Sequence, residues 1–342
     1  MIDFTQIELE SIYIHRVGNK LRDEGIEVSD KNPSLVNEDT KKYLLRYFLS
    51  PFKDNEIYNF HYPTDLNLND TYVFAKRIFA NPENLFDLSI DVSKHLYEKS
   101  SHPKINGGEF CICFFKDCFF EGKRTNAIGL FKSEKKDVFL KLTSSRIGHE
   151  SGVNIDRLDK GCLIFNLEEE NGYKVCIVDS NKSNDTQYWK DEFLSIRPAS
   201  DNFHFTKDFL SITKNFITTQ IQNDFEVSKA DQIDFLNRSV DYFKKNETFD
   251  KNEFEESVFG DSNVIDSFRK FDQNFRQENE IELADNFKIS AQAVKKQARV
   301  FKSVLKLDKN FHIYIHGNRE LIEQGVDEKG RKFYKIYYEE EN

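Results

Sequence analysis

Two different periodicities divide this chain, and together they limit its fold more than any other feature. Between residues 109 and 179, short runs rich in Phe, Ile, Val and Cys are separated by polar turns, a pattern typical of antiparallel strands. From residue 205 to residue 278, apolar side chains recur instead at every third or fourth position, as in amphipathic helices. Because strands and helices are segregated along the sequence, we predict an α+β protein with an antiparallel sheet in its N-terminal part.

Helices are predicted to accompany this sheet. A first strand is expected at 6–18, and helices at 38–52 and 81–100. The expected apolar faces of the two helices are Tyr43, Leu44, Tyr47 and Phe48 in the first and Leu85, Leu88, Val92 and Leu96 in the second. Further strands are expected at 109–120, 126–133, 137–143, 162–167 and 173–179. The first three would form two successive hairpins, and the last two would pair around a polar turn at Asn171-Gly172.

The C-terminal stretch "SAQAVKKQARVFKSVLKL" fits either a helix or a strand, depending on which apolar spacing is followed. We predict a short helix from Ser290 to about Ala298, a strand that ends at Leu307, a turn, and a second strand at 311–316. "RELIEQGV" is then expected to be a short helix and "RKFYKIYYEEE" a last strand. The chain would thus comprise an α+β domain at 1–203, a helical segment at 204–284 and a small basic α/β unit with an antiparallel meander at 285–342.

The five cysteines occur in apolar, strand-like runs, and their number is odd. Both properties argue against a disulfide framework and favour a reducing compartment. Cys111 and Cys113 share one strand face and are expected to be small buried hydrophobes. The paired ligand spacing of a zinc site is absent, so we expect no metal and no cofactor.

The charge of the chain is unevenly distributed. The net charge is −10, yet residues 286–336 contain 12 Lys/Arg against 5 Asp/Glu, which leaves −17 for the remainder. An acidic protein repels nucleic acid on average, so contact with DNA would require a local basic patch. The C-terminal segment is the best candidate for that patch.

Within this segment, "KLDKNFHIYIHG" combines flat rings with lysines. In a strand, His312, Tyr314 and His316 point to the side opposite Phe311 and Ile313, and the two histidine backbones lie about 13 Å apart, too far to share a metal. Such a face suits stacking on bases and hydrogen bonding to phosphate, although an ordinary solvent-facing strand has a similar composition. The predicted nucleic-acid-binding residues are Lys295, Lys296, Arg299, Lys302, Lys306, Lys309, His312, Tyr314 and His316.

A weaker basic group is expected at hairpin tips in the N-terminal part. It comprises Lys123 and Arg124 in one turn and Lys132, Lys135 and Lys136 in another. No phosphate-binding loop, nucleophile elbow or zinc-protease helix is present. Asp156, Asp159 and Lys160 only loosely match the acids and lysine of a metal-dependent nuclease, so we expect no catalysis.

The order of several motifs resembles the bacterial nucleoid-associated proteins of the NdpA/YejK type over nearly the whole length. The motifs are "IELESIYIHRV", "GGEFCICFF", "VNIDRLDKGCLIFNL", "YWKDEFLSIRPASDNFHFTKDFLSI" and "NFHIYIHG". One departure is Arg197-Pro198-Ala199, which stands where the family has Lys-Gly-Arg. The resemblance implies a cytoplasmic, DNA-associated protein without known catalytic activity, and it does not assign DNA contacts to residues.

Two hypotheses follow. In the first, the chain binds DNA directly, most simply double-stranded DNA, through phosphate contacts with little sequence preference. In the second, the acidic majority of the chain engages a basic partner such as a DNA-processing enzyme at the nucleoid. The N-terminus lacks secretory features and no apolar run suggests a membrane segment, so we expect a cytoplasmic location at the nucleoid; a homodimer is left open.

Overall fold

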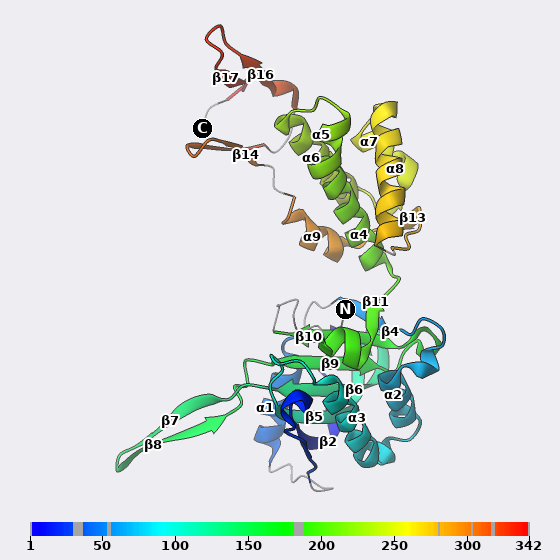
Figure 1. Ribbon diagram of the computed structural model, residues 1–342, viewed down its shortest axis with the longest axis vertical. Coiled ribbons are helices and arrows are strands. Elements are labelled where there is room, and N and C mark those ends of the chain that lie inside the picture. Colours follow the sequence, from blue (N-terminus) through cyan, green and yellow to red (C-terminus); the bar gives the residue numbers. More distant parts are fainter. Residues whose placement is uncertain are drawn as a thin grey trace. The chain divides into compact units, whose positions relative to one another are not determined.

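The computed structural model describes residues 2–29, 37–52, 56–180, 188–279, 281–301, 304–315 and 319–340. The chain forms two compact units, Met1–Ala199 and Ser200–Asn342. Strands dominate the first unit and helices the second (Figure 1). The fold is therefore α+β with antiparallel sheets, as the sequence predicts.

Unit 1 is built on an antiparallel sheet whose described strands follow the order β11-β4-β10-β9-β6-β5-β2-β3, with β1 paired to β5. The strands are β1 (Ile2–Asp3), β2 (Glu8–Val17), β3 (Ile26–Glu27), β4 (Ile57–Phe60), β5 (Gly108–Phe120), β6 (Lys123–Ser133), β9 (Lys160–Phe165), β10 (Lys174–Asp179) and β11 (Ile196–Pro198). The long strands β5 and β6 are buried at most positions, whichever face the side chain points to, so the sheet is covered on both faces.

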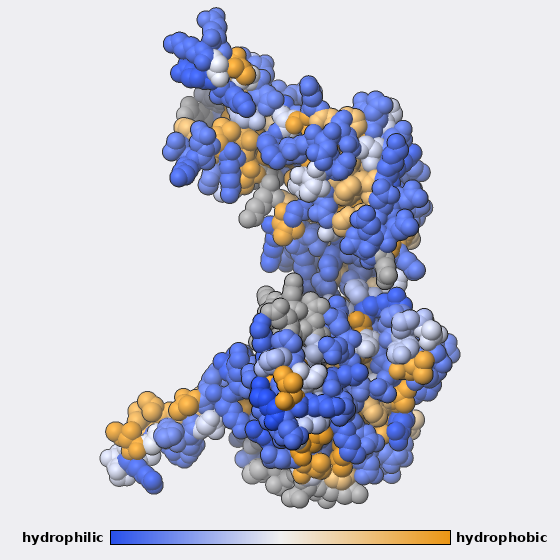
Figure 2. Space-filling model, viewed as in Figure 1, coloured by the Kyte–Doolittle hydropathy of each residue, from blue (hydrophilic) through white to orange (hydrophobic). Residues whose placement is uncertain are grey.

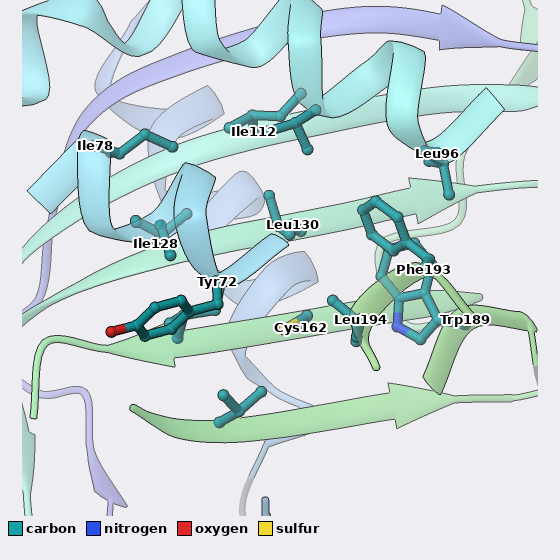
Figure 3. Packing of buried hydrophobic residues seen from close by; sticks show 14 of the residues in the cluster. Tyr72, Ile78, Leu96, Ile112, Ile128, Leu130, Cys162, Trp189, Phe193 and Leu194 are labelled. Carbon is teal, nitrogen blue, oxygen red and sulfur yellow. The ribbon is translucent and has the colours of Figure 1, made fainter. Parts of the chain in front are cut away.

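Alternate side chains of β5 enter two separate cores. Phe110, Ile112 and Phe114 join a cluster beneath α2 (Asp70–Ala80), α3 (Leu85–Lys99) and the π-helical turn η6 (Tyr188–Leu194). Cys111 and Cys113 join the opposite cluster, which α1 (Glu38–Leu49) covers. Figure 3 shows how Trp189 and Phe193 reach the first core beside Leu96 and Leu130. Short 3-10 turns complete the unit at η1 (Lys20–Arg22), η2 (Leu66–Leu68), η3 (Pro82–Asn84) and η4 (Glu169–Asn171).

Two strands of unit 1 lie outside this sheet. β7 (Asp137–Thr143) and β8 (Arg146–Gly152) pair with each other and form an arm that extends away from the rest of the unit (Figure 1). We call residues 137–152 the β7–β8 arm.

Unit 2 begins with a helical bundle that has a phenylalanine-rich core. The helices are α4 (Asn202–Asn215), η7 (Phe216–Gln220, a π-helix), α5 (Ile221–Asp224), α6 (Lys229–Lys245), α7 (Lys251–Val258), α8 (Ser262–Glu278) and α9 (Ala291–Ala298). Phe209 lies at the centre, with ring contacts to Phe243, Phe249, Phe254 and Phe268. Val294 of α9 and Phe301, which follows it, belong to the same core.

Three two-stranded sheets accompany this bundle. Their strands are β12 (Thr248–Asp250) with β13 (Asn286–Lys288), β14 (Val304–Leu307) with β15 (Phe311–Tyr314), and β16 (Ile322–Val326) with β17 (Lys332–Ile336). The C-terminal part of the unit thus consists of one short helix and small antiparallel strand pairs.

Most predicted elements are present, including the C-terminal helix with Ser290 as its N-cap. Several predictions were wrong in detail. "RELIEQGV" forms only a 3-10 turn, η8 (Arg319–Leu321), and continues as β16, because Ile322 is buried while the β16 backbone pairs with β17. The strand 126–133 pairs with β9 rather than with 137–143, whose partner is the unpredicted β8. Tyr43 is exposed, since the buried face of α1 is formed by Tyr47, Phe48 and Leu49.

Candidate nucleic-acid interface

The β14–β15 hairpin has one apolar and one polar face. His312 and Tyr314 share one face, as the alternation in the sequence predicts, and the register adds Lys306, which lies opposite His312, to the same face. All three are exposed, and Tyr314 retains 66% of its accessible surface. The two rings therefore lie at the surface rather than in the core.

The other face of the hairpin packs on α6. Leu305, 3% exposed, and Ile315 form a small core with Ala230 and Ile233 of α6 and with Ile322. Asn237 Nδ2 donates a hydrogen bond to the carbonyl oxygen of Ile315 at 3.0 Å. These contacts fix which way the polar face points.

A hollow of about 540 Å³ lies between this polar face, α6 and the residues at and after the end of α9. Its lining residues are Asn237, Val240, Asp241, Lys244, Ala298, Phe301, Val304, Lys306, His312 and Tyr314. We call this hollow the α6–hairpin groove. Lys306, His312 and Tyr314, three of the predicted binding residues, thus line one concave site. The apolar part of its lining consists of Val240, Ala298, Phe301 and Val304.

The titratable groups of the groove give it a slight positive charge. Lys244 and Lys306 contribute two positive charges, and Asp241, whose Oδ1 lies 4.0 Å from Lys244 Nζ, contributes one negative charge. No described carboxylate forms an ion pair with Lys306, nor with Lys295, Arg299 or Lys309. Uncompensated cations beside a groove favour an anionic ligand.

The other predicted residues of unit 2 lie near this groove in sequence but differ in their surroundings. Lys295 and Arg299 are exposed and one helical turn apart, at the end of α9. Lys296 is half-buried, with Nζ 5.2 Å from the centre of the Phe203 ring, so part of its surface is already used. Lys309 is exposed in the turn of the hairpin. Lys302 and His316 lie outside the described residues.

The predicted basic group of the N-terminal part belongs to the other unit. Lys123 and Arg124 are exposed at the start of β6, and Arg124 Nε donates to Asp117 Oδ1 at 2.7 Å. Lys132, expected at an exposed tip, is fully buried and donates to the Asn106 carbonyl oxygen at 2.9 Å and to Tyr188 Oη at 3.2 Å. Burial lowers the pKa of the Lys132 ammonium, and this lysine cannot reach a phosphate.

The sequence analysis missed the contribution of α6. Asn237, Asp241 and Lys244 form its groove-lining stripe, and their spacing of four and three residues is that of one helix face. The sequence analysis named no residue of α6 among the predicted binding residues. Only the packing of the hairpin against this helix distinguishes the stripe from the rest of the helix surface.

The residues considered for a nuclease site are engaged in structural contacts. Asp156 pairs with Arg46 at 2.7 Å, while Asp159, 3% exposed, accepts hydrogen bonds from the backbone N–H groups of Glu134 and Lys135. Lys160 is buried and pairs with Asp179 at 2.8 Å. Among the described residues, no group of three or more His, Cys, Asp or Glu side chains is placed to hold a metal ion.

All five cysteines are buried and free, so the predicted burial of Cys111 and Cys113 is confirmed. Burial raises the pKa of Cys111, Cys118 and Cys176 to about 12, so these thiols stay protonated at neutral pH. In the part of the chain that the structure describes, no helix is both long and apolar enough to cross a membrane.

The fold and the groove define the class of the protein: an α+β protein with a basic, ring-bearing groove in its second unit. Comparison with known families then gives a specific result, because the model of the family described as nucleoid-associated protein YejK matches residues 13–340. The chain therefore belongs to this nucleoid-associated family, as the resemblance predicts. The search of curated proteins found no match.

Proposed function

We propose that the chain binds DNA directly through the α6–hairpin groove and its basic border, without catalysing a reaction, at the nucleoid of the bacterial cytoplasm. The observation that carries this proposal is the exposed face of β14–β15, where Lys306, His312 and Tyr314 lie together opposite Lys244 of α6. Membership of a nucleoid-associated family supports a ligand at the nucleoid.

The chemistry of the groove favours the phosphate backbone over the base edges. Its cations are lysines, which act as point charges, and among its described lining residues there is no arginine to offer two parallel hydrogen bonds to guanine. Lys295 and Arg299 extend the positive charge along the exposed side of α9. We therefore propose binding to double-stranded DNA with weak sequence preference and strong salt dependence.

A salt titration with a fluorescent DNA duplex tests the proposal. Replacing Lys295, Arg299 and Lys306 together by Gln should weaken binding, and each lost phosphate contact should reduce the slope of log K against log salt by about 0.9. Lys335→Gln is the matched control, because Lys335 is an exposed strand lysine of the same unit that already lies 3.4 Å from Glu323. Unchanged affinity and slope in the triple variant would contradict the proposal.

A second function is favoured by the helical part of unit 2. Residues 200–285 contain 19 acidic against 10 basic side chains, and such a surface attracts a basic protein partner. In this alternative, the chain reaches the nucleoid through a DNA-processing enzyme. Purified protein that fails to bind DNA at low salt, but forms a salt-sensitive complex with a purified DNA-processing enzyme, would favour it.

A further inference from the structure

One face of the β7–β8 arm is mostly apolar, with four aliphatic side chains beside His149 and Ser151. Its register places Val138 opposite Ser151, Leu140 opposite His149 and Leu142 opposite Ile147, so these six side chains share one face. Val138, Leu140, Leu142 and Ile147 are each between 67% and 79% exposed. Figure 2 shows hydrophobic side chains along the arm, in contrast to the hydrophilic surface beside it.

The opposite face of the arm is mainly polar, with one exposed ring, Phe139, and it contains an ion pair between the two strands. Lys141 Nζ lies 2.7 Å from Glu150 Oε1 across the two strands. At the base, Asp137 accepts hydrogen bonds from Asn154 Nδ2 at 2.9 Å and Arg157 at 3.0 Å, and these hydrogen bonds lower the pKa of its carboxyl. The arm is thus anchored at one end, while its apolar face makes no contact with the described cores of the chain.

An arm of this kind needs an occupant for its apolar face. An isolated two-stranded hairpin is at best marginally stable in water, and a long apolar strand pair invites association. DNA is a poor occupant, because the arm contains two acidic and two basic side chains and its apolar face contains no lysine or arginine. A strongly charged protein partner would find no complementary charge on this face either.

We propose that the occupant is the same face of a second copy of this chain, so that the β7–β8 arm is a dimerisation arm. Two arms related by a twofold axis bring Val138, Leu140, Leu142 and Ile147 against their equivalents, and no like formal charges meet. The sheets then pack face to face, as in a small β-sandwich. The charged faces, with the Lys141–Glu150 pair, remain in water.

The area is adequate for a specific dimer. Eight apolar side chains, each contributing on the order of 100 Å² of buried surface, supply about 800 Å² before the polar rim is added. With that rim, the total approaches the roughly 1,200 Å² at the lower end of stable interfaces.

Sedimentation equilibrium of the full chain over a range of concentrations tests the proposal. Wild-type protein should be dimeric, and Leu140→Glu should weaken self-association by roughly a hundredfold or more, because each dimer would bury two carboxylates in a face whose other polar side chains are only His149 and Ser151. Gly148→Glu is the matched control: it introduces the same carboxylate on the opposite face, across from Lys141 and in open space, and should leave the dimer intact.

A cross-linking experiment protects the test against a variant whose arm merely unfolds. Leu140→Cys should form an intermolecular disulfide under mild oxidation faster than Lys141→Cys, and the native cysteines are buried and do not compete. A wild-type chain that stays monomeric, a Leu140→Glu dimer as tight as wild type, or equal cross-linking at both positions would overturn the proposal. The proposal does not rest on DNA binding, which the groove variants test separately.

Discussion

The β7–β8 arm and the β14–β15 hairpin are built alike but differ in the fate of their apolar faces. Each is an antiparallel strand pair with aliphatic side chains on one side. In β14–β15 this side is covered by α6, so Leu305 is 3% exposed; in the arm the equivalent side is bare, and Leu140 is 73% exposed. The difference teaches that the alternation of apolar and polar residues is enough to give a hairpin two unlike faces. Packing against a helix then decides which of the two faces stays exposed and can bind a partner.

The largest expected effect separates the two hairpins by stability. Leu305→Ala should destabilise unit 2 by about 2–5 kcal/mol, because it leaves a cavity between the hairpin and α6. Leu140→Ala, at low protein concentration, should change the free energy of unfolding by no more than about 0.5 kcal/mol. Urea unfolding followed by circular dichroism measures the loss of stability in both variants, and hydrogen exchange of α6 and β14 shows whether the effect of Leu305→Ala is confined to unit 2. Equal losses of unfolding free energy in Leu305→Ala and Leu140→Ala would contradict the difference drawn between the two hairpins.

A smaller effect concerns the polar face of β14–β15. If the Tyr314 hydroxyl donates to a phosphate, Tyr314→Phe and Tyr314→Ala should weaken duplex binding equally, by about 0.5–1.5 kcal/mol for one hydrogen bond. On single-stranded DNA, where the ring can stack on a base, Phe should bind nearly as well as Tyr while Ala should not.

Anisotropy titrations of the two Tyr314 variants against duplex and single-stranded probes distinguish these contacts. Phe139→Ala in the arm is the matched loss of an exposed ring and should leave both affinities unchanged. If Tyr314→Ala is also without effect on either probe, the rings take no part in binding.

The smallest expected effect is a dependence of stability on pH in the unit that carries the arm. His15 is buried in β2, where its Nδ1 accepts from the Ser29 N–H at 3.3 Å and its Nε2 lies 2.8 Å from Ser89 Oγ. Burial lowers the pKa of His15 below 6.5. As the pH falls through 6.5, the unfolded chain takes up a proton that the folded chain still refuses, so unit 1 loses stability.

Replacing His15 by Gln removes this titrating group. The variant should lose less stability than wild type between pH 7.5 and pH 5.5, as followed by the fluorescence of Trp189, the single tryptophan, which lies in the core of unit 1. His95, whose pKa is also lowered by burial, remains in both proteins and leaves a residual slope. Identical pH profiles for wild type and variant would contradict the role given to His15.

Several elements could be predicted from local sequence alone because their signals are local. Leu85, Leu88, Val92 and Leu96 are all buried in α3, as their spacing predicts. Ser228 caps α6 and forms a capping box with Asp231. The prediction of "RELIEQGV" as a helix failed because its backbone pairs with β17, a partner whose position the local pattern does not contain.

The candidate site was predictable only in part. His312 and Tyr314 could be placed on one face, because strand geometry fixes their alternation, whereas the place of Lys306 beside them depends on the register of β14 with β15. Lys244, Asp241 and Asn237 could not be added to them, since they are distant in sequence and meet the hairpin only through its packing on α6. The three-domain division and the contacts with DNA remain predictions.

By itself, the sequence determined the α+β class, most helices and strands, and a C-terminal excess of positive charge, since periodicity and composition are properties of the chain alone. The tertiary structure decided which charged side chains, in either unit, are exposed to solvent. Lys132 was expected at a tip and is buried beneath Tyr188, whereas Lys306 is exposed at a groove. Burial depends on contacts between distant segments, so the same residue type becomes structural in one unit and available to a ligand in the other.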